Sequence, residues 1–112
     1  MIESVKRKVT EFERRVYAMV SRVPEGRVTT YAHLARALDC GSAQAVGQAL
    51  KRNPFAPEVP CHRVIRTDFN IGGYAGQTGG EKLATKLKYL REEGVEFDES
   101  GSLKDRALVF SF

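Results

Sequence analysis

The sequence predicts a small α+β domain, mostly helical, with a helix-turn-helix core, winged-helix character and a small strand or wing element. Three observations lead to this fold class. Apolar residues recur at steps of three and four along several segments, two of these segments are joined by a short turn with a glycine, and one short segment looks like a strand. At 112 residues the chain is expected to be a single domain with one hydrophobic core, residues 1–112.

The first helix is expected over residues 9–23. Pro24-Glu25-Gly26 follows directly, and a proline and a glycine this close together end a helix. Steps of three and four place the apolar residues of the segment on one face, which we expect to point into the core: Val9, Phe12, Val16, Met19, Val20 and Val23.

A second and a third helix follow, separated by a tight turn at Cys40-Gly41. The second is expected over residues 31–38, after Val28-Thr29-Thr30, with a threonine as its N-cap. The third is expected to begin after Ser42 and to end at about Arg52. Two short helices joined by a turn that contains glycine form a helix-turn-helix, whose recognition helix would be the third. The inward faces are expected to carry Tyr31, Leu34, Ala35 and Leu38, and then Ala43, Val46 and Leu50.

The outer face of the third helix is unusual because it carries small and amide residues before two basic ones. Gly47 is the most informative of them, since glycine inside a helix costs roughly 1 kcal/mol relative to alanine. Either another surface approaches the helix closely at this point, or the helix packs tightly against the first one. The residues taken alone favour neither explanation. This outer face consists of Gln44, Ala45, Gly47, Gln48, Lys51 and Arg52.

The middle of the chain is expected to contain little regular structure. Residues 53–60 include three prolines, which exclude a helix or a central strand. Val64 to Arg66 looks like a short strand. A turn-rich, wing-like loop follows over residues 68–73, and it runs into a flexible stretch of small residues at 72–76.

The last helix is expected from about Glu81 to Glu93, with Gly94 as the residue that ends it. Leucines at helical spacing would face the core from this helix: Leu83, Leu87 and Leu90. The tail, residues 95–112, mixes polar turns with apolar residues. It is expected to add either a strand or a strap against the core.

Composition limits the classes of function. The net charge of +4 and the pI of about 9.3 are compatible with a polyanionic partner such as DNA or RNA. Two cysteines are too few for a disulfide framework, which makes a reduced, intracellular setting the expectation. No apolar run is long enough to span a membrane, and residues 1–8 lack the apolar region of a secretion signal. A cytoplasmic location is expected, or a nuclear one in a eukaryote.

The segment that carries chemistry runs from Val59 to Ile65 and contains Cys61 beside His62, after Pro60. A thiolate is a strong nucleophile, and a nearby imidazole favours its formation. Neighbouring side chains on a strand point in opposite directions, so the loop geometry or a bridging water would have to connect the two. His62 would also need an acceptor to hold its ring, and the residues alone leave this acceptor open among several carboxylates.

Other interpretations of these residues are weaker. A cysteine beside a histidine is common by chance. A zinc site would have to use Cys61, His62, Cys40 and His33, but their spacing fits no known zinc pattern, and adjacent residues rarely bind one ion. A disulfide between the two cysteines is unexpected in a reducing compartment. No metal and no cofactor are therefore expected.

The segment Pro60-Cys61-His62-Arg63-Val64 resembles the active-site signature of the O6-alkylguanine-DNA alkyltransferases. This resemblance covers about residues 9–94 and corresponds to the C-terminal, active-site domain of the family. The N-terminal domain found in many members has no counterpart here, and the tail over 95–112 is unassigned. Five further motifs match in type and order: Thr30-Tyr31, Ala45-Val46-Gly47, Asn53-Pro54, Gly72-Gly73-Tyr74 and Glu93-Gly94.

The resemblance implies five catalytic roles. Cys61 would accept the alkyl group, His62 would act as base through a water, and Glu93 would orient and stabilise the histidine. Tyr31 would donate its hydroxyl proton to guanine N3, so that the base leaves neutral. Asn53 would brace the active-site loop by bonding the backbone near Val64.

The same resemblance implies how the substrate is held. The carbonyl of Val64 would accept from the exocyclic amine of the base, while Tyr74 and Ala75 would line the base pocket. Double-stranded DNA would bind through its minor groove, where small residues on the recognition helix allow close approach. Phosphate contacts are expected from Lys51, Arg52 and Arg63. The full set of expected DNA contacts is Thr30, Gln44, Ala45, Gly47, Lys51, Arg52, Arg63 and Gly73.

The implied chemistry is direct reversal of DNA damage. The O6 atom of guanine is buried in the base stack, so the nucleotide must be flipped out, which costs a few kcal/mol. A thiolate would then displace the base from the alkyl carbon, and protonation of the base would ease its departure. The thioether product is stable, so each molecule would act once. The protein is expected to be a monomer.

The sequence departs from the family pattern at several positions. Gln44 stands where the family usually has an arginine that fills the gap left by the flipped base, and we expect weaker DNA affinity and slower flipping from it. Ala75 stands where a serine is common. The stretch 77–81 is longer than is typical, and the tail has no clear counterpart. These departures bear on substrate range and rate.

Two other functions are compatible with the sequence. Alkyltransferase-like relatives grip the same lesions without transfer and recruit excision repair; they are short like this chain, but typically carry tryptophan where this chain has Cys61. A winged-helix regulator with Cys61 as redox sensor is a third hypothesis. The few side chains on the recognition helix that could read bases argue against it.

Overall fold

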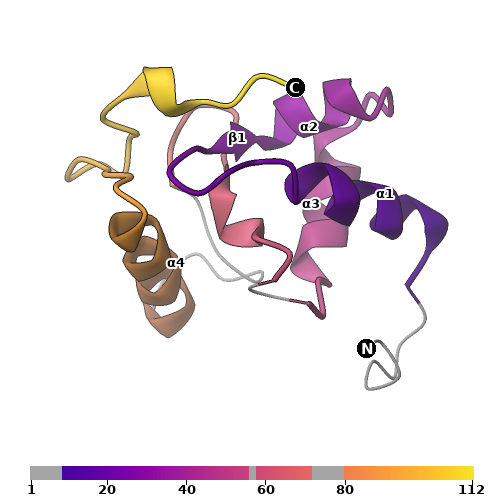
Figure 1. Cartoon of the computed structure of the whole chain (residues 1–112), viewed down its shortest axis with the longest axis horizontal. Helices are drawn as coiled ribbons and strands as arrows, with labels where there is room; N and C mark the ends of the chain where they lie inside the picture. Colours follow the sequence, from indigo (N-terminus) through magenta and orange to yellow (C-terminus); the bar gives the residue numbers. More distant parts are fainter. Residues whose placement is uncertain (1–8, 56–57, 72–79) are drawn as a thin grey trace.

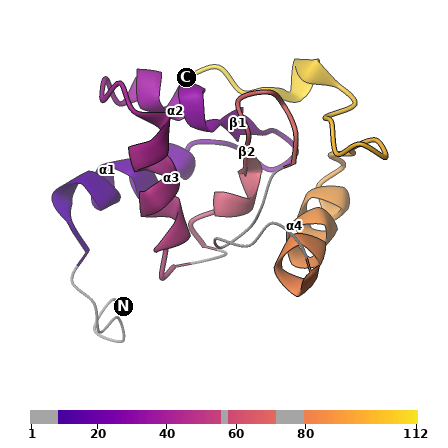
Figure 2. The ribbon, with the colours of Figure 1, turned by 180° about the vertical axis from the view of Figure 1, so that it is seen from behind.

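The computed structural model describes residues 9–55, 58–71 and 80–112 of the chain. Helices α1, α2 and α3 lie together on one side, α4 lies on the other, and two short strands lie between them (Figures 1 and 2). This architecture confirms the predicted mostly helical α+β fold. In chain order the elements are α1 (Glu11–Val20), β1 (Thr29–Thr30), α2 (Tyr31–Ala37), α3 (Ala43–Lys51), the 3₁₀ turn η2 (Cys61–Arg63), β2 (Val64–Ile65), α4 (Gly80–Glu92) and the 3₁₀ turn η3 (Arg106–Leu108).

Helix α1 is shorter than the predicted 9–23 at both ends. Thr10 forms a capping box with Glu13: the Thr10 hydroxyl accepts from the Glu13 amide at 3.1 Å, and Glu13 Oε1 accepts from the Thr10 amide at 3.0 Å. Val9 and Val23 therefore lie outside the helix, yet both are buried in the core. Of the six apolar residues predicted to face the core, Val9, Val16, Val20 and Val23 are buried, whereas Phe12 and Met19 are half-buried. The apolar spacing overestimated the length of the helix.

The helix-turn-helix is formed by α2 and α3, which pack against each other and against α1. Thr30 caps α2 by accepting from the His33 amide, and Ser42 caps α3 by accepting from the Ala45 amide, both at 3.1 Å. Helix α2 ends at Ala37, one residue before the predicted end. Both predicted caps are confirmed, and they fix where the recognition helix begins.

The sheet consists of β1 and β2 in parallel, with Thr29 opposite Val64 and Thr30 opposite Ile65. The strand over β2 ends one residue before the predicted Arg66. The partner strand was not predicted, because two residues before a helix carry no periodic signal and pair only through contacts distant in sequence. This pairing places the start of α2 beside the segment that contains the active-site cysteine signature.

The tail forms a strap rather than a strand. The Val28 amide donates to the Leu108 carbonyl at 3.0 Å, and the Phe110 amide donates to the Val28 carbonyl at 2.6 Å. Figure 1 shows the tail running from the end of α4 back over β1 towards α2. Together with α4 it covers a second core cluster, made of Val28, Ile65, Ile71, Leu90, Val95 and Leu103.

Helix α4 spans residues 80–92, so Glu93 stands just past its end instead of within it as predicted. Gly94 has φ +86 and takes the predicted terminating position, and the Val95 amide donates back to the Leu90 carbonyl at 2.9 Å. The structure describes residues 68–71 of the predicted wing, and the small-residue stretch over 72–76 lies outside the described residues. Across the described ranges, no helix is long and apolar enough to cross a membrane.

Candidate active site

Cys61 opens the 3₁₀ turn η2, which connects the proline-rich loop to β2. Its amide donates to the Val59 carbonyl at 2.8 Å, and the Arg63 amide donates to the Pro60 carbonyl at 2.9 Å. A 3₁₀ helix has three residues per turn, so neighbouring side chains diverge by about 120°. The Cys61 side chain is half-buried, whereas that of His62 is buried. Both cysteines are half-buried residues with free thiols.

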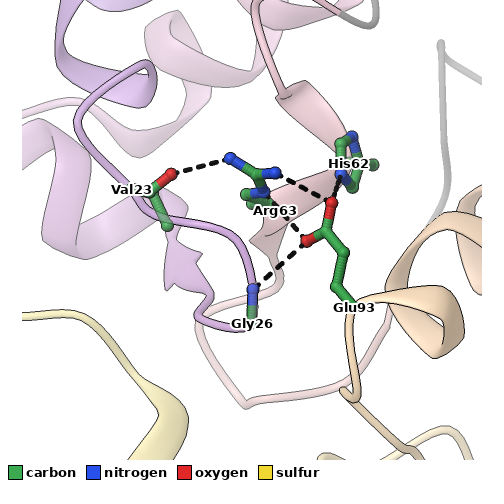
Figure 3. Close-up of polar contacts among 5 residues, drawn as sticks. All are labelled: Val23, Gly26, His62, Arg63 and Glu93. Atoms are coloured by element: carbon green, nitrogen blue, oxygen red, sulfur yellow. Dashed lines mark hydrogen bonds and ion pairs between the residues drawn. The ribbon is translucent and has the colours of Figure 1, made fainter.

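His62 is held by Glu93, which stands just past the end of α4. Nε2 of the ring and Oε2 of the carboxylate are 2.9 Å apart (Figure 3). Burial opposes ionisation of Glu93, but hydrogen bonds from Arg63 and His62 outweigh it and lower the pKa of this carboxyl. An ionised carboxylate only accepts hydrogen bonds, so Nε2 carries the proton and Nδ1 carries the lone pair.

The imidazole of His62 is kept neutral. Burial lowers its pKa; the contact with Glu93 opposes this effect, while the charges of Arg63 and Lys86 add to it. Nδ1 is buried and has no hydrogen-bond partner among the residues that the structure describes. The ring is neutral, and its basic nitrogen Nδ1 accepts no hydrogen bond from these residues. It can therefore take up a proton from a neighbouring group.

Arg63 holds Glu93 from the other side, which corrects its predicted role as a phosphate contact. Nε lies 2.9 Å from Oε1 and Nη2 lies 2.8 Å from Oε2, while Nη1 donates to the Val23 carbonyl at 2.9 Å (Figure 3). Only 16% of its side chain is exposed. All three nitrogens of the guanidinium face inward, so Arg63 orients the carboxylate that orients His62.

Asn53 braces the active-site loop at a different place from the one predicted. Its Nδ2 donates to the Val59 carbonyl at 3.1 Å, and its Oδ1 accepts from the Phe55 amide at 2.9 Å. The predicted partner was backbone near Val64. Since the Val59 carbonyl also accepts from the Cys61 amide, Asn53 acts on the loop just before the cysteine instead of after it.

Tyr31 begins α2 and lines a surface groove of about 650 Å³ together with Gln44, Gly47 and Gln48 of α3. Burial, and then the charge of Cys61, raise the pKa of Tyr31. The hydroxyl therefore keeps its proton at neutral pH and can donate it.

The glycine in α3 is explained by the groove and not by packing within the chain. A Cβ added at Gly47 would lie 3.9 Å from the Tyr31 ring, which is ordinary van der Waals contact, and would meet nothing of α1. Helix α3 does pack against α1, but Gly47 does not face that contact, so tight packing against α1 does not explain the glycine. Because Gly47 has no side chain, nothing projects from α3 into the groove beside Tyr31 at this position.

The remaining residues predicted to contact DNA differ in how exposed their side chains are. Gln44 and Lys51 are exposed on α3, Ala45 is half-buried there, and Arg52 is exposed just past the end of the helix. The prediction that Thr30 contacts DNA is corrected by the structure. Its side chain is fully buried and caps α2, so it positions Tyr31 and offers no surface to a partner. Predictions for three further residues lie outside the described part of the chain: Gly73, Tyr74 and Ala75.

Lys86 is a buried residue that the sequence-based predictions missed. Its Nζ donates to the carbonyls of Val64 and Ile71, both at 2.9 Å, and the side chain is only 1% exposed. The Val64 carbonyl, predicted to accept from the base, already accepts from this ammonium and keeps a second lone pair. Helical spacing could have indicated Lys86, since it lies three residues after Leu83 and four before Leu90, on the inward face.

No group of three histidine, cysteine, aspartate or glutamate side chains within residues 9–55, 58–71 and 80–112 is arranged to hold a metal ion. The described chemistry is that of a thiol, an imidazole held by a carboxylate and arginine, a protonated phenol and a buried ammonium. These groups are suited to nucleophilic attack by sulfur with proton transfer.

Comparison with known proteins agrees with this chemistry. Residues 11–95 match the family model of the DNA-binding domain of 6-O-methylguanine DNA methyltransferase. A methylated-DNA–protein-cysteine methyltransferase of Methanothermobacter thermautotrophicus is 47% identical over 89 residues, covering 80% of this chain and 47% of the relative. The chain thus spans about half the length of that relative.

Two solved structures are also similar. Mycobacterium tuberculosis OGT in complex with DNA has 34% identity and a TM-score of 0.68, over 77% of this chain and 51% of that one. S. pombe Atl1 in complex with damaged DNA that contains O6-carboxymethylguanine has 28% identity and a TM-score of 0.75, over 95% of this chain and 100% of that one. Both relatives were crystallised with DNA.

Proposed function

This chain belongs to the 6-O-methylguanine DNA methyltransferase family, and we propose on that premise that it repairs DNA by moving the O6-alkyl group of a guanine onto Cys61, once per molecule. The observation that carries this proposal is the bond from His62 Nε2 to Glu93. It leaves Nδ1 of a neutral imidazole as base on the residue that follows the half-buried Cys61. No cofactor is required for the reaction.

The proposed reaction balances with the groups at the site. The thiol proton of Cys61 passes to Nδ1 of His62 through a water, and the sulfur then attacks the alkyl carbon. A carbon–sulfur bond forms while the bond from carbon to guanine O6 breaks. Tyr31 supplies a proton to N3 of the base, so that neutral guanine leaves. The phenolate left at Tyr31 is balanced by the proton that His62 took from the thiol. Nothing among these groups would hydrolyse the thioether.

DNA is proposed to bind along α3, with the small residues Ala45 and Gly47 in the minor groove. The open groove that Tyr31 lines together with Gln44, Gly47 and Gln48 supports this arrangement, because a flipped base leaves the duplex beside the recognition helix. Gln44 is proposed to fill the space that the base leaves, and Lys51 and Arg52 to contact phosphates. The chain is proposed to act as a monomer and as a single active-site domain.

A second candidate function is lesion recognition without transfer. The structural similarity to S. pombe Atl1, solved with damaged DNA that contains O6-carboxymethylguanine, favours it. Against it stands a free thiol at position 61 in a site that can activate it. The presence of the nucleophile makes alkyl transfer the preferred proposal.

Intact mass distinguishes the two functions. The protein is incubated with an equimolar duplex that contains O6-methylguanine, and with the same duplex carrying guanine. Transfer predicts a mass gain of one methyl group per protein molecule with the first duplex alone. Tight binding to the lesion with no change in mass would support the non-catalytic function and contradict the transfer proposal.

Gln44→Arg is expected to tighten binding to lesion-containing DNA about tenfold, because a hydrogen bond from a charged donor contributes about 1.5 kcal/mol. The longer, charged side chain would reach into the space left by the flipped base. Fluorescence anisotropy measures the affinity at fixed salt. Gln48→Arg, one turn further along α3, is the matched control for added charge. An equal gain from the control would contradict the assigned role of position 44.

A further inference from the structure

The groove beside the recognition helix has a second wall that the proposed function does not use. One wall is formed by the start of α2 and by α3, and the other by residues 66–68, which directly follow β2. Strands β1 and β2 run parallel, with Thr30 opposite Ile65. Tyr31 and Arg66 are the next residues, so they leave the sheet at the same end. The strand pairing therefore brings an arginine to the groove that α3 lines.

This second wall carries one positive and one negative side chain, and the two are paired. Nη2 of Arg66 lies 3.1 Å from Oδ2 of Asp68, and 58% of each side chain is exposed. Among the described residues that line the groove, these two are the charged ones. An ion pair this exposed contributes little to stability, because water screens it and ordering two side chains costs entropy. The fold does not depend on the pair, so its members can exchange partners.

The two partners are held to the backbone differently. Oδ1 of Asp68 accepts from the Asn70 amide at 3.1 Å, so the carboxylate is fixed within its own turn. Across residues 9–55, 58–71 and 80–112, the guanidinium of Arg66 bonds to Asp68 alone. The arginine can therefore swing out to a new anion while the carboxylate stays in place.

The tail of the chain holds this wall in position. The Leu103 amide donates to the Phe69 carbonyl at 2.9 Å, and the Ile71 amide donates to the Gly101 carbonyl at 2.7 Å. Cζ of Arg106 lies 4.3 Å from the centroid of the Phe69 ring. Phe69 has φ +67, a left-handed conformation that is uncommon for a bulky residue, and these contacts hold the turn in it. The turn therefore keeps its two charges at the groove.

We propose that Arg66 is a phosphate-binding residue on the wall opposite α3, and that Asp68 holds it back in the free protein. On binding, the guanidinium exchanges the carboxylate for a phosphodiester oxygen of the DNA strand that borders the groove. Asp68 stays in place and repels the phosphates, which weakens binding to any duplex. This proposal rests on the part of the proposed function in which DNA binds along α3. It also supplies a phosphate contact in place of Arg63, whose guanidinium faces inward.

The test is the salt dependence of binding to an undamaged duplex, measured by fluorescence anisotropy. Each phosphate contact contributes about 0.9 to the slope of log K against log salt concentration, so Arg66→Met is expected to make the slope shallower by about 0.9. It should also weaken binding about fivefold at fixed salt. Arg66→Lys, which keeps the charge, should retain most of the slope. Asp68→Asn keeps the acceptor for the Asn70 amide and should tighten binding about threefold.

Arg91→Met is the matched control, because Arg91 is exposed on α4 and is not among the described residues that line this groove. It should leave the slope unchanged. An unchanged slope in Arg66→Met would overturn the proposal, as would an equal change in Arg91→Met or an Asp68→Asn variant that binds no more tightly. An undamaged duplex offers no alkyl group to transfer, so failure of the transfer reaction would leave these results intact. Absence of duplex binding by the native protein would overturn both proposals.

Discussion

Cys61→Ala is expected to abolish the methyl mass gain completely, while the protein stays folded and still binds DNA. The thiol is the only group at the site from which a stable thioether can form, and removing it leaves no nucleophile in its place. Cys61 is half-buried and packs against the core formed by residues of α1, α2 and α3 without being one of its buried members, so truncation to alanine should cost little stability. Intact mass, circular dichroism and lesion binding measured on one preparation give the three readouts.

Cys40→Ala is the matched control for this substitution. Cys40 is also a free, half-buried cysteine, but it lies in the turn between α2 and α3, where its Sγ donates to the Ser42 carbonyl. It should gain one methyl group as the native protein does. Retention of the mass gain in Cys61→Ala, or its loss in Cys40→Ala, would place the acceptor elsewhere.

Glu93→Gln is expected to slow transfer about 100-fold, the low end of what a positioned general base contributes. In the native protein both carboxylate oxygens accept: Oε2 from His62 and Arg63, and Oε1 from Arg63. An amide replaces one acceptor with an NH₂ donor, which then faces another donor. The His62 ring loses the partner that fixes its tautomer, and Nδ1 is no longer reliably the basic nitrogen. Single-turnover kinetics on lesion-containing DNA measures the rate.

The same substitution is expected to destabilise the fold by about 3 kcal/mol, because it leaves the charge of Arg63 without its anion in a mostly buried site. Only 12% of the Glu93 side chain and 16% of the Arg63 side chain are exposed. Urea unfolding measures this loss. The size of the effect reflects the position of the pair, which joins the end of α4 to η2 and to the loop at Val23.

Glu96→Gln is the control for loss of a carboxylate from this region. Glu96 is exposed, and its nearest contact is a 3.8 Å ion pair with Lys104, which contributes little in water. It should change neither rate nor stability measurably. A rate for Glu93→Gln within a factor of two of the native rate would contradict the role assigned to the histidine.

Those residues of the candidate site that belong to short sequence motifs could be predicted from the sequence. Cys61, His62 and Tyr31 could be identified because they belong to motifs that the resemblance carries. Arg63 was misassigned because a surface arginine and a buried one have the same sequence context, and only packing brings its guanidinium to Glu93. Lys86 was missed because lysine is rarely buried, although its spacing matches the apolar face of α4.

The order and approximate ends of the helices follow from the sequence by itself, since periodicity, caps and chain breakers act over only a few residues. The caps at Thr30 and Ser42 are examples, and so is the end of α4 at Gly94. Tertiary structure alone decided the pairing of β1 with β2, the strap, and the network of Glu93 with His62 and Arg63. These contacts join residues about 30 or more positions apart, where the partner is selected by the packing of the whole domain and not by any local pattern.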